Sequence, residues 1–301
     1  MGKARDRFLS TLSLVSRIPV KTRFNFDPSR MDYWLPVTGL FPALMVLLLF
    51  VCSSVFGIDP LAAAAVTLTA QYLCFNLFHL DGLMDTADAF LGTADREKRF
   101  SILKDSRIGV YGFFAGFAAL SLKTAFLRLI FAAPPYPAFS PENFPLAAAF
   151  LAYPLFGRFG AALVPCMTKP ASPGGLGATA KDSRPGRCIA GIVTALACFG
   201  LCVFGLTLTG IAVSGRLAAA GQLPSPGALP PNPAAALPAL VYAGFCLVLA
   251  GPLTAWFYAR LYRNSLGGYT GDALGAAIES AELLSLAAAA VIARSKFSYL
   301  L

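Results

Sequence analysis

Three aspartates and the only histidine of the chain lie within the short stretch from His79 to Asp88. Asp81, Asp85 and Asp88 are spaced i, i+4 and i+7, which on an α-helix places the three carboxylates within roughly 60° of arc on one face. Crowded carboxylates repel one another unless a cation neutralises them, and Mg²⁺ prefers such an all-oxygen environment. We therefore predict that these aspartates bind Mg²⁺ beside a phosphate group. The alternative interpretation is a solvated acidic helix face.

Proton transfer is the second task that this stretch suggests. Within the cluster, Asp85 or Asp88 is the expected general base for an attacking alcohol. His79 stands two residues before the first acid and is a candidate for a phosphate contact or a proton carrier. A lone histidine near a helix end is also commonly structural, so both interpretations of His79 stay open.

A glycine-rich loop carries a fourth acid near the C-terminal end of the chain. Asp272 follows Gly267, Gly268 and Thr270, and a helix is predicted to begin directly after this loop. Backbone N–H groups at a helix N-terminus suit phosphate binding, so we expect the two glycines and Thr270 to contact phosphate. We expect Asp272 to complete or support the metal site. The simpler alternative is that Thr270 or Asp272 caps the helix.

A short charged motif, Lys104-Asp105-Ser106-Arg107, precedes another apolar stretch. Lys104 and Arg107 are expected to hold phosphate oxygens, because guanidinium and ammonium groups donate charge-assisted hydrogen bonds to them. Asp105 lies between these two bases. It is either a further metal ligand or one member of a local ion-pair network.

Ionisable residues also occur inside apolar stretches, at Arg158, Glu279 and Glu282. A charged side chain within a membrane span is energetically costly, so it is expected to face a wet cavity or a partner of opposite charge. For Arg158 we predict a phosphate contact, with pairing to one of the two glutamates as the equally weighted alternative.

The composition indicates a membrane protein. The 301 residues are 57% hydrophobic and 13% charged, whereas a soluble domain has about 25% charged residues. The seven cysteines form no C-x-x-C pair, so neither a zinc site nor a disulfide framework is indicated. We expect an all-α, polytopic helical bundle in which residues 1–301 form a single domain.

About seven apolar stretches reach the length of about 20 residues that a spanning helix needs. They cover roughly residues 36–56, 60–80, 109–133, 144–167, 187–212, 235–259 and 273–293. Proline-rich breaks at 134–137 and 224–238 separate some of them. Residues 1–35 are expected to form a cytoplasmic, interfacial segment. The Gly112–Gly116 and Gly271–Gly275 pairs predict close helix packing.

The distribution of positive charge predicts a cytoplasmic N-terminus. With that orientation, the segment before the first span and the loops after spans two, four and six hold most of the 24 Lys and Arg residues. The acid cluster, the charged motif and the glycine-rich loop then share the cytoplasmic side. An active site facing the cytoplasm explains this shared location, whereas a transporter would also place ionisable groups near the middle of the bilayer.

The chain resembles the adenosylcobinamide-GDP ribazoletransferase family, also called the cobalamin synthase family. The matching motifs are F-H-L-D-G-L-x-D-T-x-D at 78–88, K-D-S-R-I-G at 104–109 and L-G-G-x-T-G-D at 266–272, the last continuing to residue 283. Looser matches lie at 8–20 and 174–177. Two departures are Ala89, where glycine is common in the family, and a longer proline-rich loop at 224–238.

The resemblance implies a transferase of substituted phosphate groups that carries out the final condensation in cobalamin biosynthesis. Adenosylcobinamide-GDP would react with α-ribazole or its 5′-phosphate, giving adenosylcobalamin or its 5′-phosphate and GMP. The implied cofactor is Mg²⁺, and the implied location is the bacterial cytoplasmic (inner) membrane. The lipid bilayer is an expected partner and nucleic acid is not, while a homo-oligomer or association with other cobalamin-pathway enzymes stays open.

Two other functions compete with this one. A phospholipid enzyme of the CDP-alcohol phosphotransferase type would use similar membrane-embedded aspartates and metal on a diphosphate. Its characteristic arginine and second aspartate pair are not seen in this chain, however. A small-molecule transporter is the less favoured alternative, because the face opposite the motifs is poor in polar residues.

Overall fold

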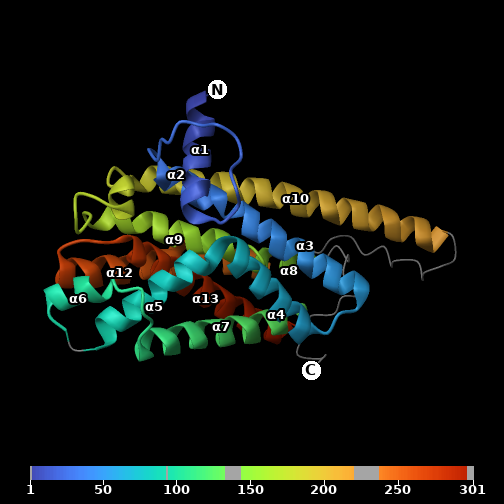
Figure 1. Ribbon diagram of the computed structural model, residues 1–301. Helices are drawn as coiled ribbons and strands as arrows, with labels where there is room; N and C mark the ends of the chain where they lie inside the picture. Colours follow the sequence, from blue (N-terminus) through green and yellow to red (C-terminus); the bar gives the residue numbers. More distant parts are fainter. Residues whose placement is uncertain (1, 93, 133–143, 220–236, 297–301) are drawn as a thin grey trace.

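The computed structural model describes residues 2–92, 94–132, 144–219 and 237–296. Within these ranges the chain is a bundle of helices with no β-strand, as Figure 1 shows, which confirms the all-α prediction. The predicted proline-rich break at 134–137 lies outside the described residues, and so does most of the stretch at 224–238.

In the described part of the chain, seven helical segments are long and apolar enough to cross a membrane, which confirms the predicted number. They are Met31–Phe56, Pro60–Leu91, Val110–Phe131, Phe144–Met167, Pro185–Gly210, Leu237–Leu266 and Gly271–Arg294. The largest departure from the predicted bounds concerns the second span, which continues to Leu91 instead of ending near residue 80. The side of the membrane on which the N-terminus lies stays a prediction.

The second span is one continuous helix that carries the acid cluster at its end. It consists of α4 (Pro60–Gln71), a π-helical turn η1 (Tyr72–Asn76) and α5 (Leu77–Leu91). Asp59 caps its start by accepting hydrogen bonds from two backbone N–H groups. A helix of 32 residues is about 48 Å long, which exceeds the hydrocarbon thickness of about 30 Å. A helix of this length is long enough to cross that layer and still extend beyond it.

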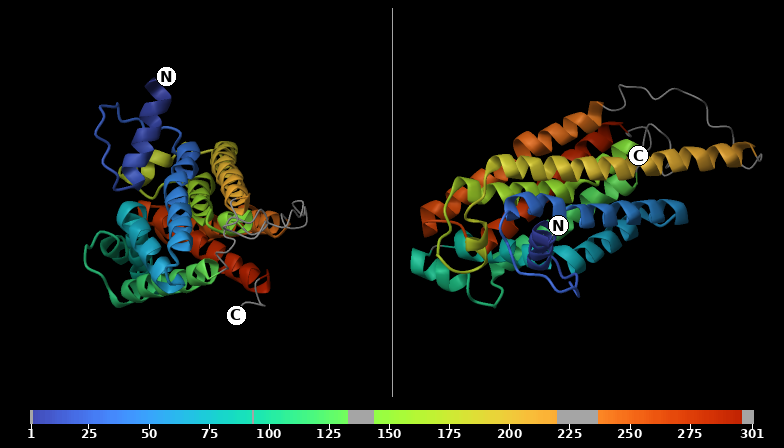
Figure 2. Two further views of the ribbon diagram at one scale, coloured as in Figure 1. Left: turned by 90° about the vertical axis from the view of Figure 1, so that its right-hand side faces the viewer. Right: turned by 90° about the horizontal axis from the view of Figure 1, so that it is seen from above.

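The core of the bundle is built by α9 (Tyr153–Met167) and α13 (Gly271–Lys296). Helix α13 packs against α9, α5, α7 (Val110–Phe131) and α12 (Gly251–Leu266), and Figure 2 shows it running through the middle of the molecule. Within the fourth span, α8 (Phe144–Phe150) leads into α9, and this span is 94% buried inside the protein. Small side chains and glycines along α9 permit this close packing.

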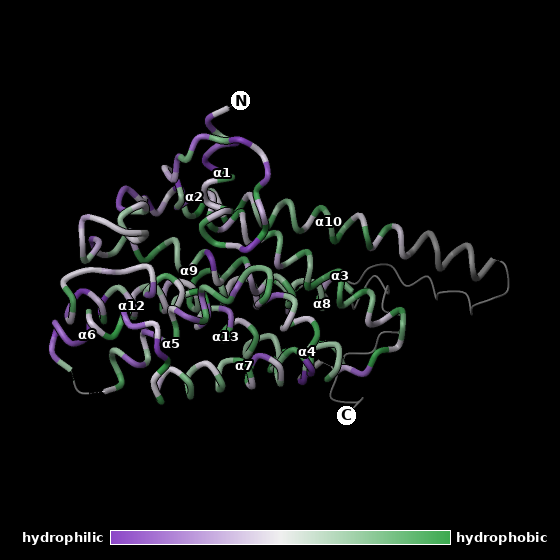
Figure 3. Tube along the Cα trace, in the orientation of Figure 1, coloured by the Kyte–Doolittle hydropathy of each residue, from purple (hydrophilic) through white to green (hydrophobic). Residues whose placement is uncertain are grey.

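The outer layer of the bundle is apolar. Helices α3 (Leu40–Phe56), α10 (Pro185–Ala219) and α11 (Leu237–Phe245) belong to it, and α11 continues through the π-helical turn η4 (Cys246–Ala250) into α12. The fifth span, on α10, is only 22% buried. Figure 3 shows hydrophobic residues along these helices and hydrophilic residues gathered around α6 (Arg96–Ile102) and the N-terminal segment. This contrast is the one expected of a bundle that faces lipid.

The N-terminal segment stands apart from the spans. Helix α1 (Gly2–Val15) projects from the side of the bundle, across the direction of the spanning helices, and packs on α2 (Met31–Thr38) (Figures 1 and 2). The short helix η2 (Leu176–Ala180) also contacts α2. An amphipathic helix lying across the spans has the geometry that an interfacial position requires.

Candidate active site at the end of the second span

The acid cluster combines residues from both ends of the sequence. Asp81, Asp85 and Asp88 lie on α5, as the spacing predicted, and Asp272 lies in the first turn of α13. The Asp85 carboxyl group is half-buried and lies within electrostatic range of the other three acids. Asp81 is exposed. The structure therefore brings four of the five predicted metal-site acids into one region at the polar end of the bundle.

Two glycines allow this meeting of α5 and α13. A Cβ atom on Gly82 would lie 2.9 Å from the Asp272 carbonyl oxygen, and one on Gly275 would lie 2.9 Å from the His79 carbonyl oxygen. Distances of this size are not tolerated between a real Cβ and a backbone atom, so the two helices cross in direct backbone contact. Of the predicted Gly271–Gly275 pair, only Gly275 is used for packing within the described chain, because a Cβ on Gly271 would meet no described atom within 4 Å.

Asp88 is held by the start of α7. One of its carboxylate oxygens accepts a hydrogen bond from the Gly109 N–H at 2.8 Å, and the other accepts one from the Gly112 N–H at 2.8 Å. A Cβ on Gly112 would clash with this carboxylate, and one on Gly116 would lie 2.8 Å from the Met84 sulfur. The predicted packing role of these two glycines is confirmed. Asp88 thus anchors α7 against α5.

The glycine-rich loop makes more backbone hydrogen bonds and close contacts than the sequence indicated. Gly267 has φ 83° and ends α12, with its N–H donating to the Arg263 carbonyl oxygen at 3.0 Å. Tyr269 pairs with the 169–171 segment through two backbone hydrogen bonds, and a Cβ on Gly268 would clash with that segment. The Thr270 hydroxyl donates to Asp272 at 3.0 Å. The backbone structure therefore requires glycine at positions 267 and 268, in addition to the predicted phosphate contact.

The charged motif before α7 forms a local ion pair. The Arg107 guanidinium donates to Asp105, with the shortest contact at 2.6 Å, and these hydrogen bonds hold the pKa of Asp105 at about 2, below its ordinary value. The structure does not place Asp105 among the charges that act on Asp85. Lys104 is exposed. This geometry favours the ion-pair interpretation of Asp105, while its role as a metal ligand stays a prediction.

The acidic residues of this site fit Mg²⁺ by the type of their donor atoms. Asp81, Asp85 and Asp272 supply only oxygen donors, which is the donor type that Mg²⁺ selects. Among the described residues, no three histidine, cysteine or acidic side chains already converge closely enough to hold a metal ion. A bound ion would therefore have to draw these carboxylates together, which side-chain rotation allows for Asp81 at the exposed surface.

The predicted phosphate contact of Arg158 requires a correction. Its side chain is 1% exposed, forms an ion pair with Glu282 at 3.0 Å and donates to Asn76 at 3.0 Å. The pairing alternative is the one that the structure shows. A guanidinium enclosed in the core and already bonded to a carboxylate and an amide has no access to a substrate phosphate.

Lys123 completes a buried ionic network that the sequence did not assign. Its ammonium group, fully buried, lies 2.7 Å from Glu279 and 2.7 Å from Glu282. Tyr72 and Asn76, on the π-helical turn of the second span, donate further hydrogen bonds to Glu279. The sequence feature that could have indicated this network is a lysine inside an apolar span, because a buried lysine without partners is energetically costly. Because Gln71 at the end of α4 and Arg158 of α9 both donate to Glu282, the network joins α4, η1, α7, α9 and α13 in the middle of the bundle.

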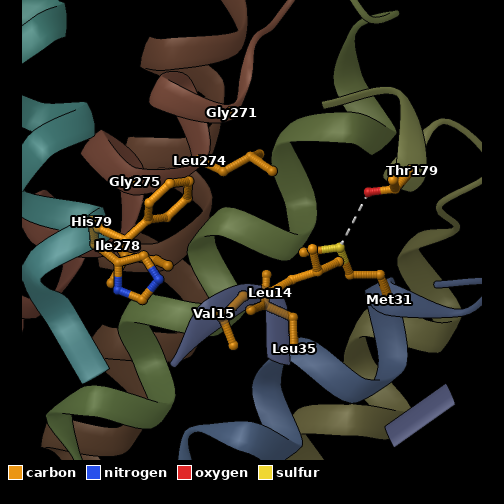
Figure 4. Close-up of a pocket in the computed structure, with 11 residues that line it drawn as sticks. Leu14, Val15, Met31, Leu35, His79, Thr179, Gly271, Leu274, Gly275 and Ile278 are labelled. Carbon is orange, nitrogen blue, oxygen red and sulfur yellow. Dashed lines mark hydrogen bonds between the residues drawn. The ribbon is translucent and has the colours of Figure 1, made fainter. Parts of the chain in front are cut away.

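His79 lies away from the acid cluster. Two residues along an α-helix correspond to about 200° of rotation, so His79 and Asp81 face opposite sides of α5. Figure 4 shows the imidazole in a cavity between α5, α13, α1 and α2, where Leu14, Val15, Leu35 and Ile278 form apolar walls. His79 is 2% exposed, and neither ring nitrogen has a hydrogen-bond partner among the described residues. The position of His79 therefore argues against the predicted phosphate contact or proton transfer beside the α5 acids.

The fold and the site together define a class: a multi-pass membrane protein with an acid-rich site at one end of its helical bundle. The family model described as Cobalamin-5-phosphate synthase matches residues 7–290 of this chain. The chain therefore belongs to the cobalamin-5-phosphate synthase family and is a transferase of cobalamin synthesis.

Relatives from several bacteria resemble the chain over nearly its whole length. A protein from Bradyrhizobium diazoefficiens is 33% identical over 281 residues, covering 92% of this chain and 90% of its own. Proteins from Sinorhizobium sp and Rhizobium etli are 32% and 33% identical, each covering 98% of its own length. All three are named adenosylcobinamide-GDP ribazoletransferase. No solved structure matches this chain significantly.

Proposed function

We propose that this chain condenses adenosylcobinamide-GDP with α-ribazole or its 5′-phosphate, releasing GMP. The proposal rests on the relatives named for this activity together with one structural observation. That observation is that Asp81, Asp88 and Asp272 all lie within electrostatic range of Asp85 at the polar end of the bundle. Four acids gathered in one region suit a diphosphate that arrives with a cation.

The reaction is a phosphoryl transfer to an alcohol. A ribose hydroxyl of the ribazole forms a new O–P bond to the phosphorus that is attached to cobinamide. The P–O bond to the GMP portion breaks, and GMP leaves with that electron pair. The hydroxyl proton passes to a carboxylate, and Asp85 is the better placed of the two predicted bases because Asp88 already accepts two backbone hydrogen bonds.

Mg²⁺ is the proposed cofactor, held by Asp81, Asp85 and Asp272. When bound, the ion would neutralise the diphosphate and stabilise the leaving GMP. Asp88 keeps α5 and α7 together beside it. We further propose that the site faces the cytoplasm of a bacterial inner membrane, because the loops at that end of the bundle carry most of the positive charge.

A condensation assay tests this function. The purified full-length protein is incubated with adenosylcobinamide-GDP, α-ribazole 5′-phosphate and Mg²⁺, and both the corrinoid product and GMP are quantified. Chelation of Mg²⁺ is expected to abolish both products, and re-addition to restore them. Asp81→Asn and Asp85→Asn should each lower the rate by at least about 10²-fold.

The matched control for these variants is Asp59→Asn, at the opposite end of the same span. Asn is as good a helix cap as Asp, so this variant should keep the native rate. Full activity of both Asp81→Asn and Asp85→Asn would contradict the assigned site. Formation of a phospholipid from a CDP-alcohol, with no corrinoid product, would instead support the phospholipid alternative.

A further inference from the structure

Two neighbouring cavities lie where α1, α2 and the N-terminal end of α10 meet. The first is about 220 Å³ and the second about 310 Å³. Arg7, Arg30 and Arg187 line both, and we call the larger one the arginine cavity. Its remaining described walls are Ala4, Tyr33, Trp34 and Ala190, so no carboxylate faces it among the described lining residues.

The carboxylates nearest to these arginines are already occupied. Asp27 lies 2.9 Å from the Arg7 Nε and also accepts a backbone hydrogen bond. Asp32, which is buried, lies 2.7 Å from the Arg187 Nε and accepts the Arg184 N–H at 2.8 Å. Each ion pair uses the inner Nε of its arginine, and one outer nitrogen of Arg187 also donates to the Asp182 carbonyl oxygen. The outer guanidinium nitrogens of Arg7 therefore stay available to an anion in the arginine cavity.

Arg30 has an unusual conformation for its residue type. Its φ of 64° and ψ of 29° are left-handed, and within the described chain it is the only residue other than glycine with a positive φ. This backbone conformation is unfavourable for a residue with a Cβ atom. The Arg30 side chain is exposed and makes no hydrogen bond or ion pair with the described residues. It thus brings a whole positive charge to the cavity.

The surroundings of the arginine cavity are those of a membrane interface. Trp34 stacks edge-on with Tyr33 and with Phe8, and aromatic residues of this kind gather at the level of lipid headgroups. Beyond the cavity, Ile189 and Val193 on α10 are 52% and 58% exposed. These apolar residues lie on a helix whose span is mostly uncovered by protein.

We propose that the arginine cavity binds the phosphate group of an anionic phospholipid. The guanidinium groups of Arg7 and Arg30 would hold the phosphate oxygens, for which planar forks are suited. Arg187, whose Nε and one outer nitrogen already have partners, would add its positive charge. The acyl chains would then run along the exposed face of α10 that carries Ile189 and Val193. The lipid would fasten α1 and α2 to the membrane surface beside the bundle.

Lipid binding can be measured without any catalytic step. The purified full-length protein is delipidated and titrated with phosphatidylglycerol or phosphatidylcholine, with native mass spectrometry and thermal melting as readouts. Phosphatidylglycerol is expected to stay bound and to raise the melting temperature, whereas phosphatidylcholine is not. Arg30→Gln should weaken the apparent affinity for phosphatidylglycerol about tenfold, because one charge-assisted contact is lost.

Two further variants make this test specific. Arg23→Gln removes the same charge from an exposed position in the same segment that does not line the cavity, and it should bind like the native chain. Arg30→Lys keeps the charge without the planar fork and should bind with intermediate affinity. Equal binding of phosphatidylglycerol to the native chain and Arg30→Gln would overturn the proposal.

A soluble phosphate ligand is the competing occupant. Inorganic phosphate and α-ribazole 5′-phosphate are therefore tested in the same melting assay. If either one protects the native chain through Arg30 while phosphatidylglycerol does not, the lipid proposal is wrong. Because none of these readouts requires turnover, failure of the lipid proposal is distinguishable from failure of the proposed condensation.

Discussion

Gly82 of α5 lies directly against Asp272 of α13, and a Cβ atom at Gly82 would come 2.9 Å from the Asp272 carbonyl oxygen. This single contact joins two motifs that are almost two hundred residues apart in the sequence. Because it is a contact between backbones, the distance between the α5 acids and Asp272 depends on the absence of a side chain at Gly82.

Replacing Gly82 with alanine should therefore separate the two halves of the site. The added methyl group overpacks the crossing by about 1–3 kcal/mol and displaces α13. A displacement of this kind is expected to lower the condensation rate by about 10²-fold while the protein still inserts and folds. The control is Gly205→Ala on the outer helix α10, where a Cβ would meet no atom of the described residues within 4 Å. A native rate for Gly82→Ala would contradict the importance of this crossing.

Asp88 is expected to act on structure as well as on chemistry. Asp88→Asn replaces one acceptor by an N–H group that faces a backbone donor, which costs about 1–3 kcal/mol locally. Hydrogen exchange at the Gly109 and Gly112 amides, measured by mass spectrometry, should become faster. Asp81→Asn is the matched comparison, because the Asp81 carboxylate makes no bond to these amides, which donate to Asp88, and should leave that exchange unchanged. Unaltered exchange in Asp88→Asn would show that the carboxylate does not hold α7.

Lys123 should be essential for folding and not for chemistry. Lys123→Met leaves Glu279 and Glu282 buried without their shared cation, and breaking a buried pair typically destabilises by about 3–5 kcal/mol. The double variant Lys123→Met with Glu279→Gln removes one charge of each sign and should recover part of the loss. Thermal melting in detergent measures both. A double variant no more stable than the single one would argue against direct coupling.

The Asp105–Arg107 pair predicts a particular response to pH. The folded pKa of Asp105 lies at about 2, below its ordinary value of 3.8. The contribution of this pair is therefore fully present above pH 3.8 and is lost as the pH falls through about 2. Between pH 5 and 9, the rate profile of Asp105→Asn should have the same shape as the native profile. A profile displaced along the pH axis would indicate that Asp105 acts within the site after all.

Several features of this protein follow from the order of residue types along the chain. The number of spans follows from apolar length, because a helix, which satisfies its backbone polar groups internally, needs about 20 apolar residues to cross the hydrocarbon layer. The shared face of Asp81, Asp85 and Asp88 follows from the period of the α-helix. The family is also readable in the motifs, and the match over residues 7–290 confirms it.

Other features were decided only by the tertiary structure. A sequence does not say which buried charges meet, so from the sequence Arg158 could contact a phosphate or a glutamate. The packing of α9 against α13 pairs it with Glu282. For the same reason, the sequence alone could not show that Lys123 pairs with Glu279 and Glu282. The glycine-rich loop looked free for a ligand, yet pairing with residues 169–171 uses the Tyr269 N–H.

The acid cluster depends both on the local sequence and on the tertiary structure. Local helical spacing, which depends only on neighbours in the chain, was enough to place three aspartates on one face of α5. The approach of Asp272 depends on the crossing of α5 and α13, and that crossing depends on backbone contact at Gly82 and Gly275. Helix periodicity is a property of the sequence alone, whereas the distance between two helices is set by how all the surrounding side chains pack.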